Sequence, residues 1–237
     1  MTREPILITG VGRRLGLDLA LNFLNRGSQV IGTYRSERPA LAELRHRGAG
    51  LYRCDFDDEA QLQAFIEAVK DRHARLRALI HNASEWLPDD HGLPAAEILR
   101  RMMQIHVAVP YQLNLSLAPL LEASESPHSD IIHVGDYVSS RGSRKHIAYA
   151  ASKAAQDNLT LSFAAKLAPK VKVNSIAPAL MLFNEDDDED YREKALGKSL
   201  MRREGGFSEF QHAVDYLLGS DYVTGRVLAL DGGRHLA

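Results

Sequence analysis

The strongest constraint on the fold is an alternation of short apolar runs with longer stretches of helical period along the chain. The short runs are rich in β-branched residues, and the longer stretches place apolar side chains three or four positions apart. Strands that alternate with helices in this way form βαβ units, whose parallel strands are covered on both faces. The sequence therefore predicts a single α/β domain over residues 1–237, built on a doubly wound parallel sheet.

The apolar pattern also predicts where the elements lie. We expect strands at residues 6–9, 29–33, 76–81, 130–134, 171–176 and 226–230, and a weaker strand at 51–53. Helices are expected at residues 15–25, 59–72, 95–121, 148–167 and 207–219. Six acidic residues at 185–190 repel one another, so this run is expected in an exposed loop. It lacks the spaced ligands and the glycine of a calcium loop, and we expect no metal site.

Length, charge and cysteine content narrow the class of protein. The chain has 237 residues, and its net charge of −2 gives no electrostatic reason to bind nucleic acid or an anionic membrane. It shows neither a secretory signal pattern nor an apolar run long enough to cross a bilayer. Cys54 is the only cysteine, so an internal disulfide is impossible and a reducing compartment is favoured. We therefore expect a cytoplasmic protein.

A glycine-bearing turn at residues 9–16 joins the first expected strand to the first expected helix. Gly10 and its neighbours permit a tight turn and a close approach of the backbone to a pyrophosphate, which would lie at the helix N-terminus. A turn without a ligand is the alternative, but strand, turn and helix occur together here as a dinucleotide site requires. The sheet is thus expected to be of the Rossmann type, with Gly10, Arg13, Arg14 and Leu15 at the cofactor.

The end of the second strand indicates which nicotinamide cofactor is bound. Proteins that prefer NAD place an acidic residue there to bind the ribose 2′-hydroxyl. This chain has Tyr34, Arg35 and Ser36 instead, and Glu37 falls beyond the expected position. Arg35, Ser36 and Arg13 would neutralise a 2′-phosphate, so the sequence predicts NADPH.

Tyr149 and Lys153 are the main catalytic candidates. Residues four apart lie on one face of a helix, and an ammonium beside a phenol would lower the pKa of the tyrosine. Such a pair is suited to proton transfer near neutral pH. Asp136 follows the strand expected at 130–134, where it either accepts hydrogen bonds from a ligand or only forms a turn.

These motifs, in this order, resemble the short-chain dehydrogenase/reductase family over nearly the whole chain. Besides Tyr149 and Lys153, they comprise the glycine turn, Asp55, the sequence at 81–84, the sequence at 174–178 and the sequence at 224–233. Two departures resemble the pteridine reductases within that family. Arg14 replaces the middle glycine of the turn, and Asp136 replaces a serine that steadies a carbonyl in most members.

The resemblance implies roles for further residues. Asp55 and Phe56 would hold the adenine, although Asp55 is equally suited to cap the helix expected at 59–72. Trp86 would stack the pterin against the nicotinamide, the alternative being a partly buried loop residue. His106 stands where many members have an asparagine. We expect a buried histidine whose ring nitrogens are hydrogen-bonded, and whether it also takes part in catalysis stays open. The cofactor set also includes Asn82, Ala83, Ser84, Tyr149, Lys153 and Pro178, and the substrate set Arg14, Ser84, Trp86, Asp136, Tyr149, Leu180 and Phe183.

The implied activity is the NADPH-dependent reduction of 7,8-dihydromonapterin to its tetrahydro form, with 7,8-dihydrofolate as a possible second substrate. A substrate loop is expected at about residues 179–205. Two alternatives stay open: a carbonyl reductase of 3-oxoacyl thioesters, and a regulatory protein that binds NADPH without turnover. The resemblance further implies a homotetramer, in which residues 234–236 would reach a neighbouring subunit's active site.

Overall fold

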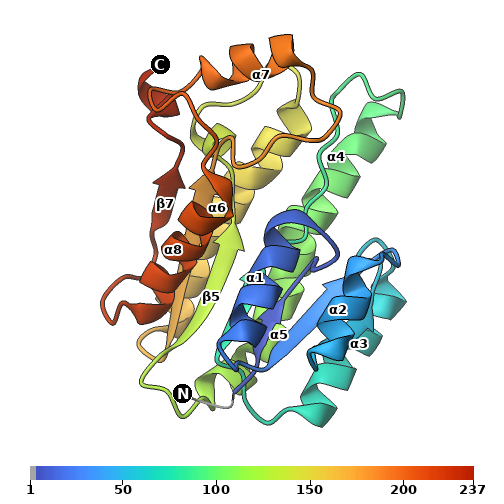
Figure 1. Ribbon diagram of the computed structural model, residues 1–237. Coiled ribbons are helices and arrows are strands. Elements are labelled where there is room, and N and C mark those ends of the chain that lie inside the picture. Colours follow the sequence, from blue (N-terminus) through green and yellow to red (C-terminus); the bar gives the residue numbers. More distant parts are fainter. Residues whose placement is uncertain (1–3) are drawn as a thin grey trace.

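The computed structural model describes residues 4–237 and contains one seven-stranded sheet (Figure 1). The strands are all parallel and lie in the order β3-β2-β1-β4-β5-β6-β7. Their bounds are β1 Ile6–Ile8, β2 Val30–Tyr34, β3 Gly50–Arg53, β4 Ala78–His81, β5 Ser129–Val134, β6 Val171–Pro178 and β7 Val227–Leu230. All seven expected strands are therefore confirmed, within a residue or two at their ends.

Helices cover both faces of the sheet, as the alternation predicted (Figure 1). One face carries α1 Arg14–Asn25, α2 Ala40–His46 and α8 Gly206–Gly219. The other carries α3 Glu59–Arg72, α4 Ala95–Met103, α5 Val109–Glu122 and α6 Ile147–Leu167. Helix α7 Glu189–Leu196 and two short 3₁₀ turns, Tyr137–Ser140 and Arg234–Leu236, complete the elements at the top of Figure 1.

Strand β1 explains why the short runs are apolar at every position. Successive side chains of a strand point to opposite faces, so a strand covered on both sides needs apolar residues throughout. Leu7 is buried in the core beneath α3, α5 and α6, whereas Ile6 and Ile8 are buried beneath α1, α2 and α8. The two cores hold the sheet rigidly and leave its strand ends free to carry functional residues.

The structure departs from the sequence predictions in the helix expected at 95–121. A π-helical segment, Gln104–Ala108, interrupts it and contains His106. Pro110 has no N–H to donate to the carbonyl of His106, so the regular i→i−4 pattern is broken at this point. Such a change of helical period brings different side chains to the sheet than an unbroken helix would.

Two other differences concern short helices. The expected loop at 185–190 is exposed, but its last residues begin α7, whose N-cap is Asp188. Helix α2 was not predicted, because seven residues with only Leu41 and Leu44 buried show too little periodicity. Among residues 4–237 no helix is long and apolar enough to cross a membrane.

Candidate active site

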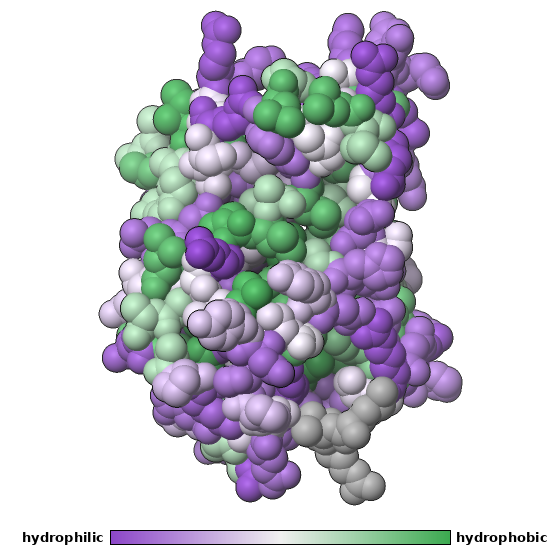
Figure 2. Space-filling model, turned by 90° about the vertical axis from the view of Figure 1, so that its left-hand side faces the viewer, coloured by the Kyte–Doolittle hydropathy of each residue, from purple (hydrophilic) through white to green (hydrophobic). Residues whose placement is uncertain are grey.

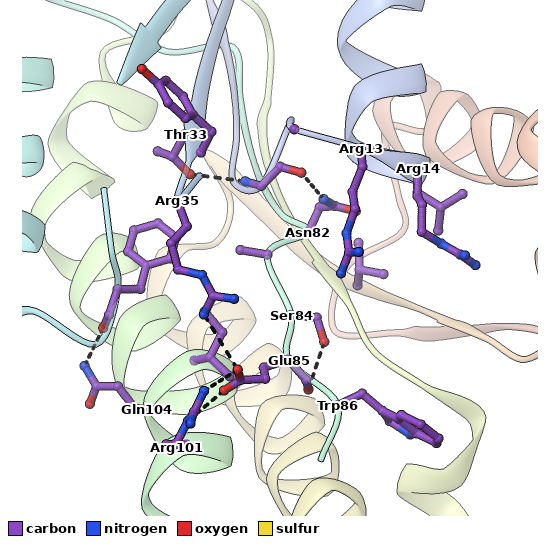
Figure 3. A pocket seen from close by; sticks show the side chains of 18 of the residues that line it. Arg13, Arg14, Thr33, Arg35, Asn82, Ser84, Glu85, Trp86, Arg101 and Gln104 are labelled. Carbon is purple, nitrogen blue, oxygen red and sulfur yellow. Dashed lines mark hydrogen bonds and ion pairs between the residues drawn. The ribbon is translucent and has the colours of Figure 1, made fainter. Parts of the chain in front are cut away.

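A cleft of about 880 Å³ lies at the carboxyl ends of the strands (Figure 3). The strand order reverses between β1 and β4, and ligands of open α/β sheets bind at such a switch point. Residues of the β1–α1 turn, the ends of β2 to β5 and helix α6 line the cleft. One concave site therefore receives side chains from segments far apart in the sequence.

The glycine turn is shaped for close approach at Gly10. This residue has a φ of +75°, and a Cβ atom there would lie 2.9 Å from the Cα atom of Ala83. The side-chain amide of Asn82 donates to the carbonyls of Thr9 and Gly10, at 3.0 Å each. Asn82 and Ala83 thus support the turn from β4, and only glycine fits at position 10.

Four arginines gather at the cofactor end of the cleft. Burial and the like charges of Arg38, Arg14 and Arg35 lower the pKa of Arg13. All four line the cleft, and mutual repulsion means that a bound anion would stabilise them. Glu37, the nearest acidic residue in sequence, pairs instead with Arg45 at 2.6 Å. The expected preference for a 2′-phosphate therefore has a physical basis, and the residues present fit that group.

Glu85 forms ion pairs with two arginines in the same region (Figure 3). Its carboxylate lies 3.6 Å from the guanidinium of Arg35 and also pairs with Arg101 on α4. The Arg35 side chain is 61% exposed, so this contact orients it only loosely. Arg35 remains available to a ligand.

Arg14 connects the glycine turn to the substrate loop. It has a φ of +51°, a conformation that costs energy for a residue with a side chain. Its two terminal nitrogens donate to Asn184 Oδ1 at 2.6 Å and to the carbonyl of Leu182 at 2.8 Å. The planar guanidinium thus bridges two segments that are 168 or more residues apart.

Tyr149 and Asp136 form the centre of the site. The Tyr149 hydroxyl donates to Asp136 Oδ2 at 2.9 Å, and Asp136 Oδ1 accepts from the N–H of Val138 at 2.9 Å. Burial raises the pKa of Asp136 above its usual range. Burial, followed by the neighbouring Asp136 charge, raises the pKa of Tyr149 well above 10. The phenol is therefore protonated at neutral pH, and its hydrogen points at a carboxylate.

The Lys153 ammonium is hydrogen-bonded to β5, which differs from the arrangement that the sequence predicted. Its Nζ donates to the carbonyl of Val134 at 2.7 Å and to Gln156 Oε1 at 3.2 Å, and lies 5.7 Å from the centre of the Tyr149 ring. Burial lowers its pKa to about 8. The expected lowering of the Tyr149 pKa is wrong for this arrangement, because burial and then the Asp136 charge raise it, while the Lys153 ammonium is directed at β5.

His106 is an interior residue with both ring nitrogens bonded, as expected. Nε2 lies 2.8 Å from Ser84 Oγ and Nδ1 lies 2.9 Å from Ser152 Oγ. The ring also meets Tyr149 edge-on, with centroids 5.3 Å apart. Burial, and then the charge of Lys153, holds the pKa of His106 well below its usual value, so the ring is neutral.

Trp86 lines the cleft and is 61% exposed, so the partly buried alternative is wrong. One face of its indole stacks on His146, with centroids 4.0 Å apart and an angle of 23° between the rings. The loop that carries Trp86 is tied to helix α6, because Asp89 Oδ2 accepts from the N–H of Ile147 at 2.8 Å. Figure 3 places Trp86 at the far end of the cleft from Arg35.

The pattern of the whole chain identifies its family. A family model described as enoyl-(acyl carrier protein) reductase, within the short-chain dehydrogenases/reductases, matches residues 10–235. The chain is a short-chain dehydrogenase/reductase. It is 55% identical over 233 residues to a dihydromonapterin reductase from Klebsiella pneumoniae, covering 98% of this chain and 97% of that one. The dihydromonapterin reductase of Escherichia coli K12 is also 55% identical, with the same coverage.

Solved structures of the same family agree with this fold. FolM alternative dihydrofolate reductase 1 from Brucella canis, complexed with NADP, has a TM-score of 0.86 at 26% identity and covers 99% of this chain and 94% of its own. The Brucella suis protein of the same name, also with NADP, has a TM-score of 0.84 at 26% identity, with coverages of 99% and 96%.

Most of the residues predicted for this short-chain dehydrogenase/reductase site do line one cleft, but two do not. Leu180 lines a separate cavity of about 190 Å³, and Phe183 packs edge-on against Tyr191. The alternative role of Asp55 as a helix cap is wrong, since Asp58 caps α3. The predicted residues that line the cleft are Gly10, Arg13, Arg14, Leu15, Tyr34, Arg35, Ser36, Asp55, Phe56, Asn82, Ala83, Ser84, Trp86, Asp136, Tyr149, Lys153 and Pro178.

Sequence reasoning missed several residues of the site. Arg38 lies beyond the strand end, where position alone does not reveal that it faces the cleft. Glu85 and Arg101 meet only because the segment that follows β4 reaches α4 in space. His146 directly precedes α6, and nothing in its spacing indicates a stack with Trp86. Among the described residues no cluster of His, Cys, Asp or Glu is arranged to hold a metal.

Proposed function

We propose that this enzyme reduces 7,8-dihydromonapterin to 5,6,7,8-tetrahydromonapterin with NADPH. The observation that carries the proposal is Asp136, whose carboxylate accepts the Tyr149 hydroxyl at 2.9 Å inside the cleft. A carboxylate at this position suits a ligand with N–H donors, whereas a carbonyl needs a donor there. The 55% identity to dihydromonapterin reductases supports the same substrate class.

The arginine cluster supports NADPH as the cofactor. Arg13, Arg35 and Arg38 would bind the 2′-phosphate, and the turn at Gly10 would receive the pyrophosphate at the start of α1. Both Brucella structures were solved with NADP. When bound, NADPH would supply a hydride to C6 of the N5=C6 bond of the pterin.

In this proposal, residues of this chain hold the pterin in place and supply the proton that N5 gains. The exposed face of Trp86 would stack on the flat ring, and His146 supports the other face of the indole. Asp136 would accept hydrogen bonds from the 2-amino group and a ring N–H. N5 gains one proton for each hydride received at C6, either from the protonated Tyr149 or from a water beside it.

Lys153 would hold the nicotinamide ribose. Because burial lowers its pKa to about 8, the protonated form of Lys153 is only moderately favoured over the neutral amine at neutral pH. Hydrogen bonds that the ammonium donates to ribose hydroxyl oxygens would replace part of the lost solvation. Arg14, which bridges to Asn184 and Leu182, would fix the substrate loop over the bound ligands.

Turnover assays test the proposal against its alternatives. NADPH oxidation should be measured with 7,8-dihydromonapterin, dihydrobiopterin, 7,8-dihydrofolate and a 3-oxoacyl thioester. We expect the highest kcat/KM with dihydromonapterin and slower turnover of dihydrofolate, whose longer tail must also fit the loop. Turnover of the thioester alone would favour a carbonyl reductase. Binding of NADPH without turnover of any substrate would favour a regulatory protein.

We further propose that the enzyme acts as a homotetramer in the cytoplasm. Apolar side chains gather between charged ones on the face that carries the edge strand β7 (Figure 2). Val227 of β7 is 41% exposed, and Leu161 on α6 is 53% exposed. Association would bury such side chains. Residues 234–236 lie against their own chain, since the Arg234 guanidinium is 4.3 Å from the Tyr137 ring centre.

A further inference from the structure

A buried chain of hydrogen bonds connects the cleft to helix α6 through His106. From the cleft inward, Ser84 Oγ lies 2.8 Å from His106 Nε2, and His106 Nδ1 lies 2.9 Å from Ser152 Oγ. Ser152 Oγ then lies 2.7 Å from the carbonyl oxygen of Tyr149. His106 and Ser152 have no exposed surface, whereas Ser84 is exposed and lines the cleft.

The direction of this chain follows from its buried end. A carbonyl oxygen only accepts, so the single hydroxyl hydrogen of Ser152 is donated to Tyr149. Ser152 Oγ must then accept from His106, which places the imidazole hydrogen on Nδ1. A neutral imidazole carries one such hydrogen, and His106 is neutral. Nε2 is therefore an acceptor, and Ser84 donates to it.

Two other acceptors near Ser84 are weaker than His106 Nε2. The carbonyl of Glu85 lies 3.5 Å from Ser84 Oγ, beyond the usual range for a hydroxyl donor, whereas His106 Nε2 lies at 2.8 Å. The Tyr149 hydroxyl is also close enough for its contact with Ser84 to lower the pKa of the phenol, but a phenol oxygen is a weaker acceptor than a neutral imidazole nitrogen. The hydroxyl hydrogen of Ser84 thus points into the protein. Its oxygen lone pairs are left for the cleft.

We propose that His106 is a positioning residue that commits the Ser84 hydrogen to Nε2, so that Ser84 can only accept a hydrogen bond from a ligand. Phosphate oxygens offer no hydrogen at neutral pH, so Ser84 would not bind a cofactor phosphate. It would instead accept an N–H of the pterin ring or of its amino group. The family resemblance assigns Ser84 to both cofactor and substrate, and the hydrogen-bond direction narrows this to the substrate. The identity of the ligand rests on the proposed function, but the direction of the chain does not.

Nuclear magnetic resonance tests the direction without any substrate. Long-range ¹H–¹⁵N spectra of the imidazole side chains distinguish a protonated ring nitrogen from an unprotonated one. The His106 signals, identified by their loss in His106→Gln, should show a hydrogen on Nδ1 and none on Nε2. A hydrogen on Nε2 would overturn the proposal, because Ser84 would then be free to donate.

Two variants of His106 test the consequence for binding. The amide of His106→Gln supplies one donor and one acceptor at a spacing similar to that of the ring nitrogens, whereas His106→Phe supplies neither. The KM for dihydromonapterin should rise about tenfold in His106→Phe and stay within about threefold in His106→Gln. The NADPH dissociation constant should change less than twofold in both. Equal losses in the two variants, or an equal loss of NADPH affinity, would refute the role.

A matched pair on helix α6 controls for the loss of a buried hydroxyl. Ser152 and Thr160 are both fully buried, and each contacts the Nδ1 of a buried histidine, His106 at 2.9 Å and His133 at 2.8 Å. Ser152→Ala removes the acceptor that fixes the His106 tautomer, so the pterin KM should rise severalfold. Thr160→Ala should leave it unchanged. The same rise in both would indicate a general packing effect and contradict the proposal.

A failure of the proposed function and a failure of the proposed hydrogen-bond direction give different results. Wild-type protein that reduces no dihydropterin would refute the proposed function, while the imidazole spectra would still test the hydrogen-bond direction. Wild-type turnover of dihydromonapterin together with a hydrogen on Nε2 would refute the direction alone. If His106→Phe fails to fold, the comparison of Ser152→Ala with Thr160→Ala decides the outcome.

Discussion

Replacing Arg35 with alanine should weaken NADPH binding and leave NADH binding nearly unchanged. Arg35 is one of three arginines whose charges lower the pKa of Arg13, and its side chain is 61% exposed. Two unit charges 4 Å apart attract by about 1 kcal/mol in water, the appropriate limit for so exposed a group. A 2′-phosphate with a charge of about −1.5 to −2 would then lose about 1.5–2 kcal/mol. This corresponds to a roughly 10- to 30-fold increase in the NADPH dissociation constant.

Fluorescence titration with each cofactor measures the effect. Arg26→Ala is the matched control, because Arg26 is also exposed and ion-paired, but with Asp215 on α8 and outside the cleft. The loss of NADPH affinity in Arg35→Ala should shrink as salt is added, since the interaction is screened. A variant that loses NADPH and NADH affinity equally, or neither, would refute the assignment of Arg35 to the 2′-phosphate.

Three further predictions follow from the site and the core. Trp86→Ala should abolish intrinsic tryptophan fluorescence, as this is the only tryptophan, and raise the pterin KM about tenfold, because stacking contributes about 1–3 kcal/mol; an unchanged KM would contradict stacking. Asp136→Ser should lower kcat/KM for dihydromonapterin at least about 100-fold with NADPH affinity within twofold, and equal losses would indicate a structural role. Burial lowers the pKa of His81 to about 4, so between about pH 6.5 and 4 the unfolded state binds more protons than the folded state. The stability of the fold therefore decreases as the pH is lowered through that window. When the pH is lowered from 7 to 5, the free energy of unfolding, measured by urea denaturation, should fall by about 2 kcal/mol more in wild type than in His81→Gln. Equal decreases in the two proteins would refute His81 as the cause.

The sequence was sufficient to predict the sheet because its signal is local. Ile6, Leu7 and Ile8 are apolar at consecutive positions since each is buried by one of the two helical layers. The glycine turn was predictable for a related reason: Gly10 needs both a positive φ and the absence of a Cβ beside Ala83. Such requirements fix the residue type at a single position.

What the sequence could not predict depends on contacts between distant segments. The stack of His146 on Trp86 joins residues 60 apart, through a loop fixed by Asp89. The pKa of Tyr149 depends on burial and on where the Lys153 ammonium points, and the i,i+4 spacing specifies neither. The π-helical turn at His106 results from Pro110 within an otherwise regular apolar pattern. Local spacing places these residues near one another but leaves their hydrogen bonds undetermined.

The central claim is that a hydride passes from NADPH to C6 of a dihydropterin while N5 gains a proton. The most direct measurement uses NADPH deuterated at both C4 positions, with 7,8-dihydromonapterin as the substrate, followed by mass spectrometry and NMR of the pterin product. We predict one deuterium per molecule of tetrahydromonapterin, located at C6. NADPH oxidation that leaves the pterin without deuterium, or that proceeds only with a 3-oxoacyl thioester, would contradict the account.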